Sequence, residues 1–183
     1  MNAPVHRVYF ALWPDDSSRA ALAAAAAPAA AASAGRAVLA EHLHLTLAFV
    51  GSVAPAVLGA LARIGAALSW PVVTLRFGPV ECWPSARALV MLAEHPPAAL
   101  LEAHAALCSR LAEHGFGPDA RPFRAHVTIA RDVRHAPPQC ALDVEWTAGR
   151  VALVESQPLP GGSCYRPLAL FEPHASNAEF HVI

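Results

Sequence analysis

The strongest constraint on the fold of this chain is a five-residue pattern that occurs twice. The segments His44 to Ala48 and His126 to Ala130 both read histidine, apolar residue, threonine, apolar residue, alanine. Ten histidines and four threonines among 183 residues give roughly 0.2 His-x-Thr triplets expected by chance. Two copies with matching apolar flanks therefore predict two related strands in two related halves of the chain.

Strand geometry places the chemistry of each copy on one face. Successive side chains of a strand point to opposite faces, so each histidine shares a face with its threonine while the apolar residues point to the core. Two such strands lining one cleft bring together two imidazoles and two hydroxyls. One imidazole can take a proton from the attacking group and the other can protonate the leaving oxygen, while the hydroxyls bind non-bridging phosphate oxygens. The candidate catalytic residues are His44 and His126, and the candidate substrate-binding residues are Thr46 and Thr128.

Other interpretations of these residues stay open. A single histidine or threonine on a strand is most often a core or surface residue, although duplication at matching register argues against that here. His42, His44 and His126 could ligate zinc, but no carboxylate or cysteine recurs at a fixed spacing near either copy, and we predict no metal. Thiol chemistry has less support, because the cysteines are scattered without a CxxC pair. They are Cys82, Cys108, Cys140 and Cys164.

Apolar periodicity and turn residues predict about seven or eight strands and two or three helices. Strands are expected over 5–13, 43–50, 72–81, 88–93, 125–131, 142–146, 151–154 and 165–171, and helices over 55–68, 96–114 and from about residue 18 to the glycine at 35. Segregated hairpins and few crossovers favour an α+β class over a doubly wound parallel sheet. No linker or shift in composition marks a boundary, so residues 1–183 are expected to form a single domain.

Composition excludes several classes of protein. A chain with 55% apolar and 15% charged residues is globular rather than disordered. Its net charge of −1 argues against binding nucleic acid through bulk charge, so any such contact must be local. All 13 basic residues are arginines, which excludes P-loop, Schiff-base and nucleotidyl-lysine chemistry. No basic leader precedes an apolar segment and no apolar run is long enough for a membrane span, so a cytoplasmic protein without membrane contact is expected.

With these motifs in place, the chain resembles the 2H phosphoesterase superfamily, which is defined by paired His-x-Thr/Ser motifs. The nearest resemblance is to bacterial and archaeal RNA 2′,3′-cyclic phosphodiesterases, historically called 2′-5′ RNA ligases. It is carried by the segments 9–15, 43–51, 122–131, 153–156 and 162–166. The resemblance implies a bilobal α+β fold in which two related antiparallel sheets line a central cleft, with helices outside. The tail beyond Phe171 is longer than the usual ending of this family.

The resemblance also implies an activity. Family members open the 2′,3′-cyclic phosphate of RNA ends with water to leave a 2′-phosphate, and they need no metal or cofactor. Joining RNA ends through a 2′-5′ linkage, as the reverse reaction with a 5′-hydroxyl in place of water, needs no lysine either. The expected partners are RNA ends or tRNA fragments that carry a 2′,3′-cyclic phosphate, and the protein is expected to be a monomer.

Residue roles follow from the same resemblance. His44 and His126 are the acid/base pair, and we assign His44 as the acid and His126 as the base, with near-symmetry leaving the reverse open. Arg131 matches a family arginine near the phosphate, although strict alternation turns it away from His126. Phe10 and Tyr165 are candidates for stacking on a base, although aromatic residues in strands are more often core.

Two alternatives of function remain beside this one. The cleft could bind RNA ends or tRNA with little turnover, although binding alone does not need two titratable groups at one phosphate. Another branch of the superfamily acts on 2′-5′ oligoadenylates or small cyclic nucleotide phosphates, and the sequence does not separate these substrates.

Overall fold

A computed structural model describes residues 5–117, 121–133, 141–159 and 162–173 of the chain. Three α-helices occur within these ranges: α1 (Asp16–Ala32), α2 (Leu58–Ala66) and α3 (Ala98–Glu113). The strands are β1 (His6–Leu12), β2 (Arg36–Ala37), β3 (Leu45–Val53), β4 (Val73–Trp83), β5 (Ala88–Glu94), β6 (His126–Arg131), β7 (Ala141–Ala148), β8 (Val151–Leu159) and β9 (Gly162–Phe171). Single-turn 3₁₀ helices cover Ala40–His42, Pro55–Val57 and Pro84–Ala86.

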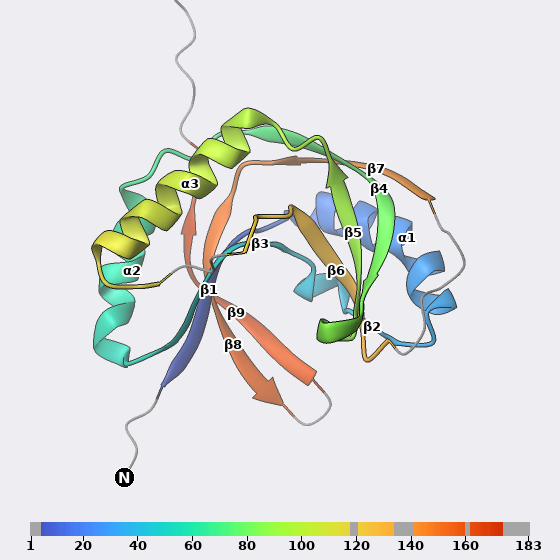
Figure 1. Cartoon of the computed structure of the whole chain (residues 1–183), viewed down its shortest axis with the longest axis horizontal. Coiled ribbons are helices and arrows are strands. Elements are labelled where there is room, and N and C mark those ends of the chain that lie inside the picture. Colours follow the sequence, from blue (N-terminus) through green and yellow to red (C-terminus); the bar gives the residue numbers. More distant parts are fainter. Residues whose placement is uncertain (1–4, 118–120, 134–140, 160–161, 174–183) are drawn as a thin grey trace, which may run out of the picture.

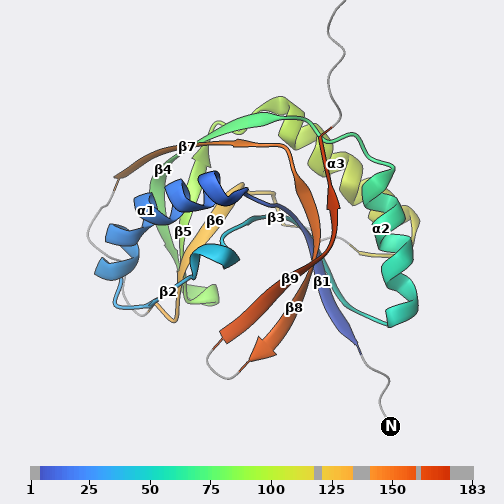
Figure 2. The ribbon, with the colours of Figure 1, turned by 180° about the vertical axis from the view of Figure 1, so that it is seen from behind.

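The strands form one curved antiparallel sheet. Their order is β7-β4-β5-β6-β3-β1-β8-β9, with β2 paired to β6. Helices α2 and α3 pack against each other at one end of the sheet, and α1 packs against β6 and β7. The concave side opens between the outer ends of β8–β9 and β5–β6 (Figures 1 and 2). The predicted α+β class is confirmed, because hairpins dominate the sheet and the helices pack outside it.

The two halves of the sheet meet at a single point. The strands expected as two sheets join through β3 and β6, where Leu45 pairs with Val127. These two residues are the central apolar positions of the two His-x-Thr motifs. The seam between the halves therefore runs through both motifs, and one continuous sheet of nine strands results.

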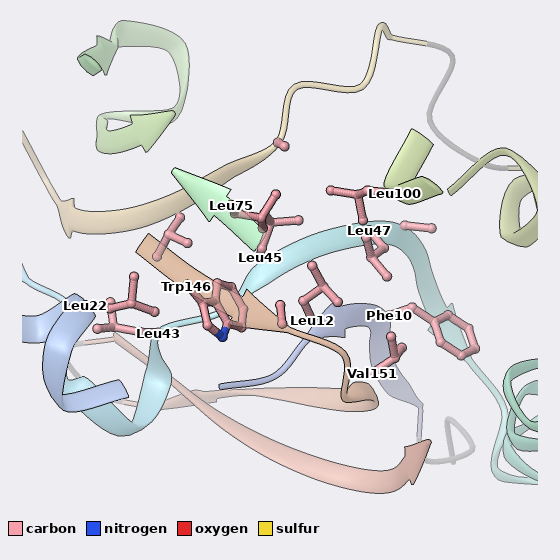
Figure 3. Close-up of a cluster of buried hydrophobic side chains, with 14 of the residues drawn as sticks. Phe10, Leu12, Leu22, Leu43, Leu45, Leu47, Leu75, Leu100, Trp146 and Val151 are labelled. Carbon is pink, nitrogen blue, oxygen red and sulfur yellow. The ribbon is translucent and has the colours of Figure 1, made fainter. Parts of the chain in front are cut away.

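A single large apolar cluster lies between the sheet and the helices. The apolar residues of both motifs belong to it, as predicted, because alternation turns them away from the histidines. Helix α1 contributes Leu22 and strand β7 contributes Trp146 to the same cluster (Figure 3). The motifs are thus anchored from behind by the main core, and their polar side chains face the concave side.

The prediction that Phe10 stacks on a base is wrong. Its side chain is 0% exposed and packs on Phe171 in the core, with ring centroids 6.2 Å apart. Strand β1 alternates, so Phe10 faces the core while its neighbours Tyr9 and Ala11 face the concave side. Sequence reasoning found the right strand and the wrong face of it.

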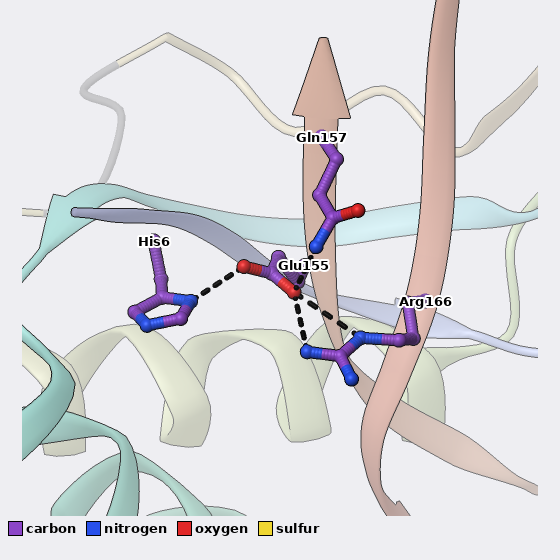
Figure 4. Close-up of polar contacts among 4 residues, drawn as sticks. All are labelled: His6, Glu155, Gln157 and Arg166. Carbon is purple, nitrogen blue, oxygen red and sulfur yellow. Dashed lines mark hydrogen bonds and ion pairs between the residues drawn. The ribbon is translucent and has the colours of Figure 1, made fainter. Parts of the chain in front are cut away.

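Strand β8 is longer than predicted because polar residues continue it. The apolar run ends at Val154, yet β8 extends to Leu159 and pairs with β9 from Gly162 onward. Glu155 is almost fully buried in this extension and binds His6, Gln157 and Arg166 (Figure 4). Burial would raise the pKa of Glu155, but these hydrogen bonds outweigh it and lower the pKa. A buried carboxylate held by three side chains fastens β1, β8 and β9 together.

The helices differ from prediction only at their ends. The Asp15 side chain accepts a hydrogen bond from the Ser18 backbone N–H, so α1 begins at Asp16. Residues 55–57 form a 3₁₀ turn before α2. None of the helices in the described ranges is long and apolar enough to cross a membrane. The Pro137-Pro138 loop, the Gly161 turn and the tail from residue 174 lie outside the described residues.

Candidate active site

The paired strands bring both His-x-Thr motifs to one cavity. Because β3 and β6 run antiparallel about the pair Leu45–Val127, the register places His44 beside Thr128 and Thr46 beside His126. All four of these side chains line a cavity of about 1040 Å³ on the concave side. Two imidazoles and two hydroxyls are therefore arranged around one centre with a local two-fold symmetry.

Each motif histidine is held in the same way. The Nδ1 atom of His44 lies 2.7 Å from the carbonyl oxygen of His42, and Nδ1 of His126 lies 2.7 Å from the carbonyl oxygen of Arg124. A carbonyl oxygen only accepts, so Nδ1 donates and carries the hydrogen in both rings. Each Nε2 is then the atom that can exchange a proton with a ligand. The carbonyl two residues before each histidine fixes both tautomers.

His44 sits among aromatic rings. Tyr9 and Tyr165 each lie 5.0 Å from its ring centroid, and Trp13 lies 5.9 Å away and nearly parallel. Burial lowers the pKa of His44 to about 4; the carbonyl contact opposes this shift, and the positive charges of Arg131 and of neighbouring histidines add to it. Near neutral pH this imidazole is therefore an unprotonated base.

His126 has a more open environment, and within the described ranges one aromatic ring lies beside it. Trp83 lies 4.4 Å from its ring centroid, and the Arg124 guanidinium lies 5.4 Å from the centre of the Trp83 ring. Glu81 accepts hydrogen bonds from Trp83 Nε1 at 3.0 Å and from Arg124 at 2.8 Å. Burial, followed by the charges of Arg131 and Arg124, lowers the pKa of His126.

Trp83, Glu81 and Arg124 are functional neighbours that the sequence motifs do not identify. The sequence places Trp83 in a hairpin connection, whereas it ends β4 and packs against His126. The signal that could have found the group is the alternation of β4, which puts Glu81 and Trp83 on one face. These three residues support the second motif from outside it.

A β-bulge brings Arg131 into the cavity. Consecutive residues of β5 pair with Thr128 and Ala130, so Ile129 is an extra residue in β6. The bulge changes which later residues share a face with His126, and Arg131 lines the cavity despite the odd spacing. Its charge lowers the pKa of both motif histidines. The Asp132 carboxylate pairs instead with Arg36 and Arg87.

The cavity is positively charged although the chain is not. Its described lining holds five arginines and four histidines and no aspartate or glutamate. A concave site with one sign of charge attracts an anionic ligand. The arginines are Arg7, Arg36, Arg121, Arg124 and Arg131, and the histidines are His42, His44, His104 and His126.

Two tyrosines complete the wall on the side of His44. Tyr165, the second candidate for base stacking, lines the cavity and meets the rings of His42, His44 and Tyr9 edge-on. Tyr9 is 2% exposed, and its hydroxyl is buried without a hydrogen-bond partner in the described structure. Burial raises the pKa of Tyr9, so this hydroxyl stays neutral.

The described residues do not have the arrangement that the metal or the thiol interpretation requires. Among the described residues, no three or more His, Cys, Asp or Glu side chains gather closely enough to hold a metal ion. In His44 and His126, the Nδ1 atoms are already engaged by carbonyls. Cys108 lines the cavity beside His104, but burial raises the pKa of its thiol and keeps it protonated.

Comparison with known proteins gives a consistent result. Residues 14–158 match the 2′-5′ RNA ligase superfamily. The chain is 31% identical over 136 residues to RNA 2′,3′-cyclic phosphodiesterase of Escherichia coli (strain K12), which covers 74% of this chain and 77% of that protein. The crystal structure of E. coli LigT complexed with 3′-AMP matches with a TM-score of 0.83 at 27% identity, over 94% of this chain and 100% of that one.

A further solved structure shares the fold. The Thermus thermophilus protein TT0787 matches with a TM-score of 0.77 at 24% identity, over 91% of this chain and 97% of that one. The sequence match spans both His-x-Thr motifs, and the structural matches span nearly the whole chain. This chain belongs to the 2′-5′ RNA ligase superfamily.

Proposed function

We propose that this protein hydrolyses the 2′,3′-cyclic phosphate at RNA ends to a 2′-phosphate. The observation that carries the proposal is the pair of motif histidines, each with Nδ1 held by a carbonyl, on one positively charged cavity. The E. coli relative is an RNA 2′,3′-cyclic phosphodiesterase, and the similar LigT structure binds 3′-AMP. Both support a nucleotide with a terminal phosphate as the ligand.

The reaction is a displacement at phosphorus by water. The base histidine removes a proton from water as the oxygen attacks phosphorus, and the bond from phosphorus to O3′ breaks on the opposite side. The acid histidine gives its Nε2 proton to O3′, which leaves as a 3′-hydroxyl beside a 2′-phosphate. The hydroxyls of Thr46 and Thr128 donate to the non-bridging oxygens, and Arg131 balances the growing negative charge.

The unequal surroundings of the two histidines favour one assignment of roles. His44 is enclosed by three rings and has a pKa near 4, so it is the better candidate for the neutral base. His126 is less enclosed, and it takes up a proton more readily when an anionic phosphate enters the cavity. We therefore propose His44 as base and His126 as acid, the reverse of the assignment preferred from sequence.

A 5′-hydroxyl of a second RNA can take the place of water in the same step. Attack by that oxygen, with loss of the bond to O3′, gives a 2′-5′ linkage instead of a free 2′-phosphate. No activated nucleotide is consumed, because the strained cyclic ester supplies the leaving group. We propose this ligation as a second outcome of the same site.

The decisive experiment uses purified protein, EDTA and an oligonucleotide that ends in a 2′,3′-cyclic phosphate. We expect turnover that EDTA does not change, with a 2′-phosphate product identified by phosphorus NMR. Binding without turnover would instead identify an RNA-end or tRNA-binding protein. Loss of activity with EDTA and recovery with zinc would identify a metal enzyme. Turnover restricted to 2′-5′ oligoadenylates or cyclic mononucleotides would place the protein in another branch of the superfamily.

Three expectations about the whole protein stay predictions: a single domain over residues 1–183, a monomer and a cytoplasmic location. Light scattering coupled to gel filtration checks the second of these. A mass near 19.2 kDa is expected, and twice that mass would identify a dimer.

A further inference from the structure

The two motif strands contain the same kind of β-bulge, which only the pairing of the sheet reveals. In β3, consecutive residues of β1 pair with Thr46 and Ala48, so Leu47 is an extra residue, as Ile129 is in β6. Each bulge lies three residues after the motif histidine. The residue five positions after each histidine consequently lines the cavity: Phe49 in one half and Arg131 in the other. The same backbone device presents a phenyl ring on one side and a guanidinium on the other.

Among the exposed large apolar residues of the described structure, Phe49 is the one with an aromatic ring. It is 47% exposed, it pairs with Tyr9 across β1 and β3, and the two ring centroids lie 5.6 Å apart. Tyr9 in turn lies 5.0 Å from the His44 ring. Phe49 therefore offers one ring face to the cavity, one side chain away from His44. An exposed aromatic ring beside a phosphate site is a platform on which any base can stack.

Arg7 lies farther out on the same wall. It precedes Tyr9 by two residues on β1 and lines the cavity, so it sits on the same face about 7 Å along the strand. Arg7 is exposed, and no acidic side chain in the described part of the chain pairs with it. A free guanidinium beyond an aromatic platform suits a second phosphate, farther out than the one at the motif centre.

The cavity is larger than one phosphate group requires. Its volume of about 1040 Å³ lies just above the range of about 300–1,000 Å³ for small-molecule pockets. One cyclic phosphate among the two histidines and two threonines fills only the centre. The wall from Tyr9 to Arg7 remains for the rest of the nucleotide.

We infer that Phe49 stacks on the base of the terminal nucleotide and that Arg7 binds the phosphate on the 5′ side of that nucleotide. This inference rests on the proposed function and adds a preference to it. A nucleoside 2′,3′-cyclic phosphate has no 5′-phosphate, whereas every RNA end longer than one nucleotide does. Arg7 thus selects RNA ends over cyclic mononucleotides, which separates two substrate classes that the motifs alone do not.

The test compares two substrates: adenosine 2′,3′-cyclic phosphate, and the dinucleotide ApA ending in a 2′,3′-cyclic phosphate. In Arg7→Gln, we expect the ratio of kcat/KM for the dinucleotide over the nucleoside to fall about tenfold, in line with a lost phosphate contact. The matched control is Arg63→Gln, because Arg63 is exposed on α2 and outside the cavity lining. That control should keep the wild-type ratio. An unchanged ratio in Arg7→Gln overturns the role of Arg7.

The test of Phe49 removes and then restores the aromatic ring, with KM as the readout. In Phe49→Leu, we expect KM to rise about tenfold for both substrates with kcat within about threefold, because base stacking contributes to binding. Phe49→Trp should restore KM, and Leu101→Ala, which removes an exposed leucine from α3, should leave KM unchanged. An unchanged KM in Phe49→Leu, or no recovery in Phe49→Trp, overturns the role of Phe49. If wild-type protein hydrolyses neither substrate, the proposed function itself fails.

Discussion

The two motif strands have nearly the same backbone and different surroundings. In both, a carbonyl two residues earlier accepts a hydrogen bond from histidine Nδ1 at 2.7 Å, and a bulge follows the threonine. The rings around His44 come from β1, β9 and the residue after β1, whereas the ring beside His126 comes from β4. The repeat thus sets the geometry of each half, and neighbouring strands set the proton affinity. Under the proposed assignment, two similar motifs supply one base and one acid.

Removing either histidine should have the largest effect. We expect His44→Ala and His126→Ala each to lower kcat about 100-fold or more, because each loses one of two proton transfers at the same phosphate. The double variant should fall far short of the product of the two losses, since the residues act as a unit. Single-turnover kinetics measures this, and thermal unfolding checks that the variants fold. Fully multiplicative losses would mean that the two halves act at separate sites.

Removing a threonine hydroxyl should have the next largest effect on kcat, and it tests whether both motifs bind the phosphate. Thr46→Val and Thr128→Val each remove one hydroxyl from the cavity at nearly constant volume. We expect each to lower kcat by about 10- to 100-fold, as loss of one preorganised donor does. Thr→Ser at either position retains the hydroxyl and should recover most of the rate. A loss confined to one position would show that the phosphate sits in one half only.

The sequence predicted the parts of this site that depend on alternation. The motif histidines and threonines lie on one face because Leu45 and Val127 pair at the seam, and the α+β class follows from the hairpins. Features that depend on irregular backbone could not be predicted from the sequence. The bulges at Leu47 and Ile129 are not visible in the apolar pattern of the sequence. Strict alternation therefore does not predict that Phe49 and Arg131 line the cavity.

Tertiary pairing decides the remaining features. The choice between Phe10 and Tyr9 depends on which face of β1 meets the core, and both faces of that strand carry aromatic residues. The continuation of β8 depends on Glu155, whose burial is tolerated only because His6 and Arg166 come from strands on either side. Side chains that arrive from another strand are invisible to local pattern. The enclosure of His44, on which its proposed role rests, depends on such side chains from other strands.

A smaller effect is expected when the ring beside His126 is removed. In Trp83→Leu, more water reaches the imidazole, so the pKa of His126 should rise toward its ordinary value of 6.5. The alkaline limb of the kcat/KM profile should then move to higher pH, with kcat lowered about threefold. The limb is measured by initial rates between about pH 4 and 9. A limb that does not move would show that Trp83 does not set the proton affinity of His126.

The smallest effect concerns stability rather than rate. His44 has a lowered pKa when folded, so between 6.5 and about 4 the unfolded chain takes up a proton at this position that the folded chain does not. The stabilisation is fully present above pH 6.5 and is lost as pH falls to about 4. His44→Asn should therefore flatten the fall of Tm across this window. Equal slopes in wild type and variant would mean that His44 is not enclosed as described.

The most direct test of the unequal pair is the pH dependence of kcat/KM for wild type, His44→Ala and His126→Ala. A base must be neutral and an acid protonated, so the wild-type profile should be a bell with an acidic limb near pH 4 and an alkaline limb below 6.5. His44→Ala should lose the acidic limb, and His126→Ala should lose the alkaline one. Loss of the opposite limbs would reverse the roles, and a wild-type profile flat from about pH 5 to 9 would contradict two-histidine catalysis altogether.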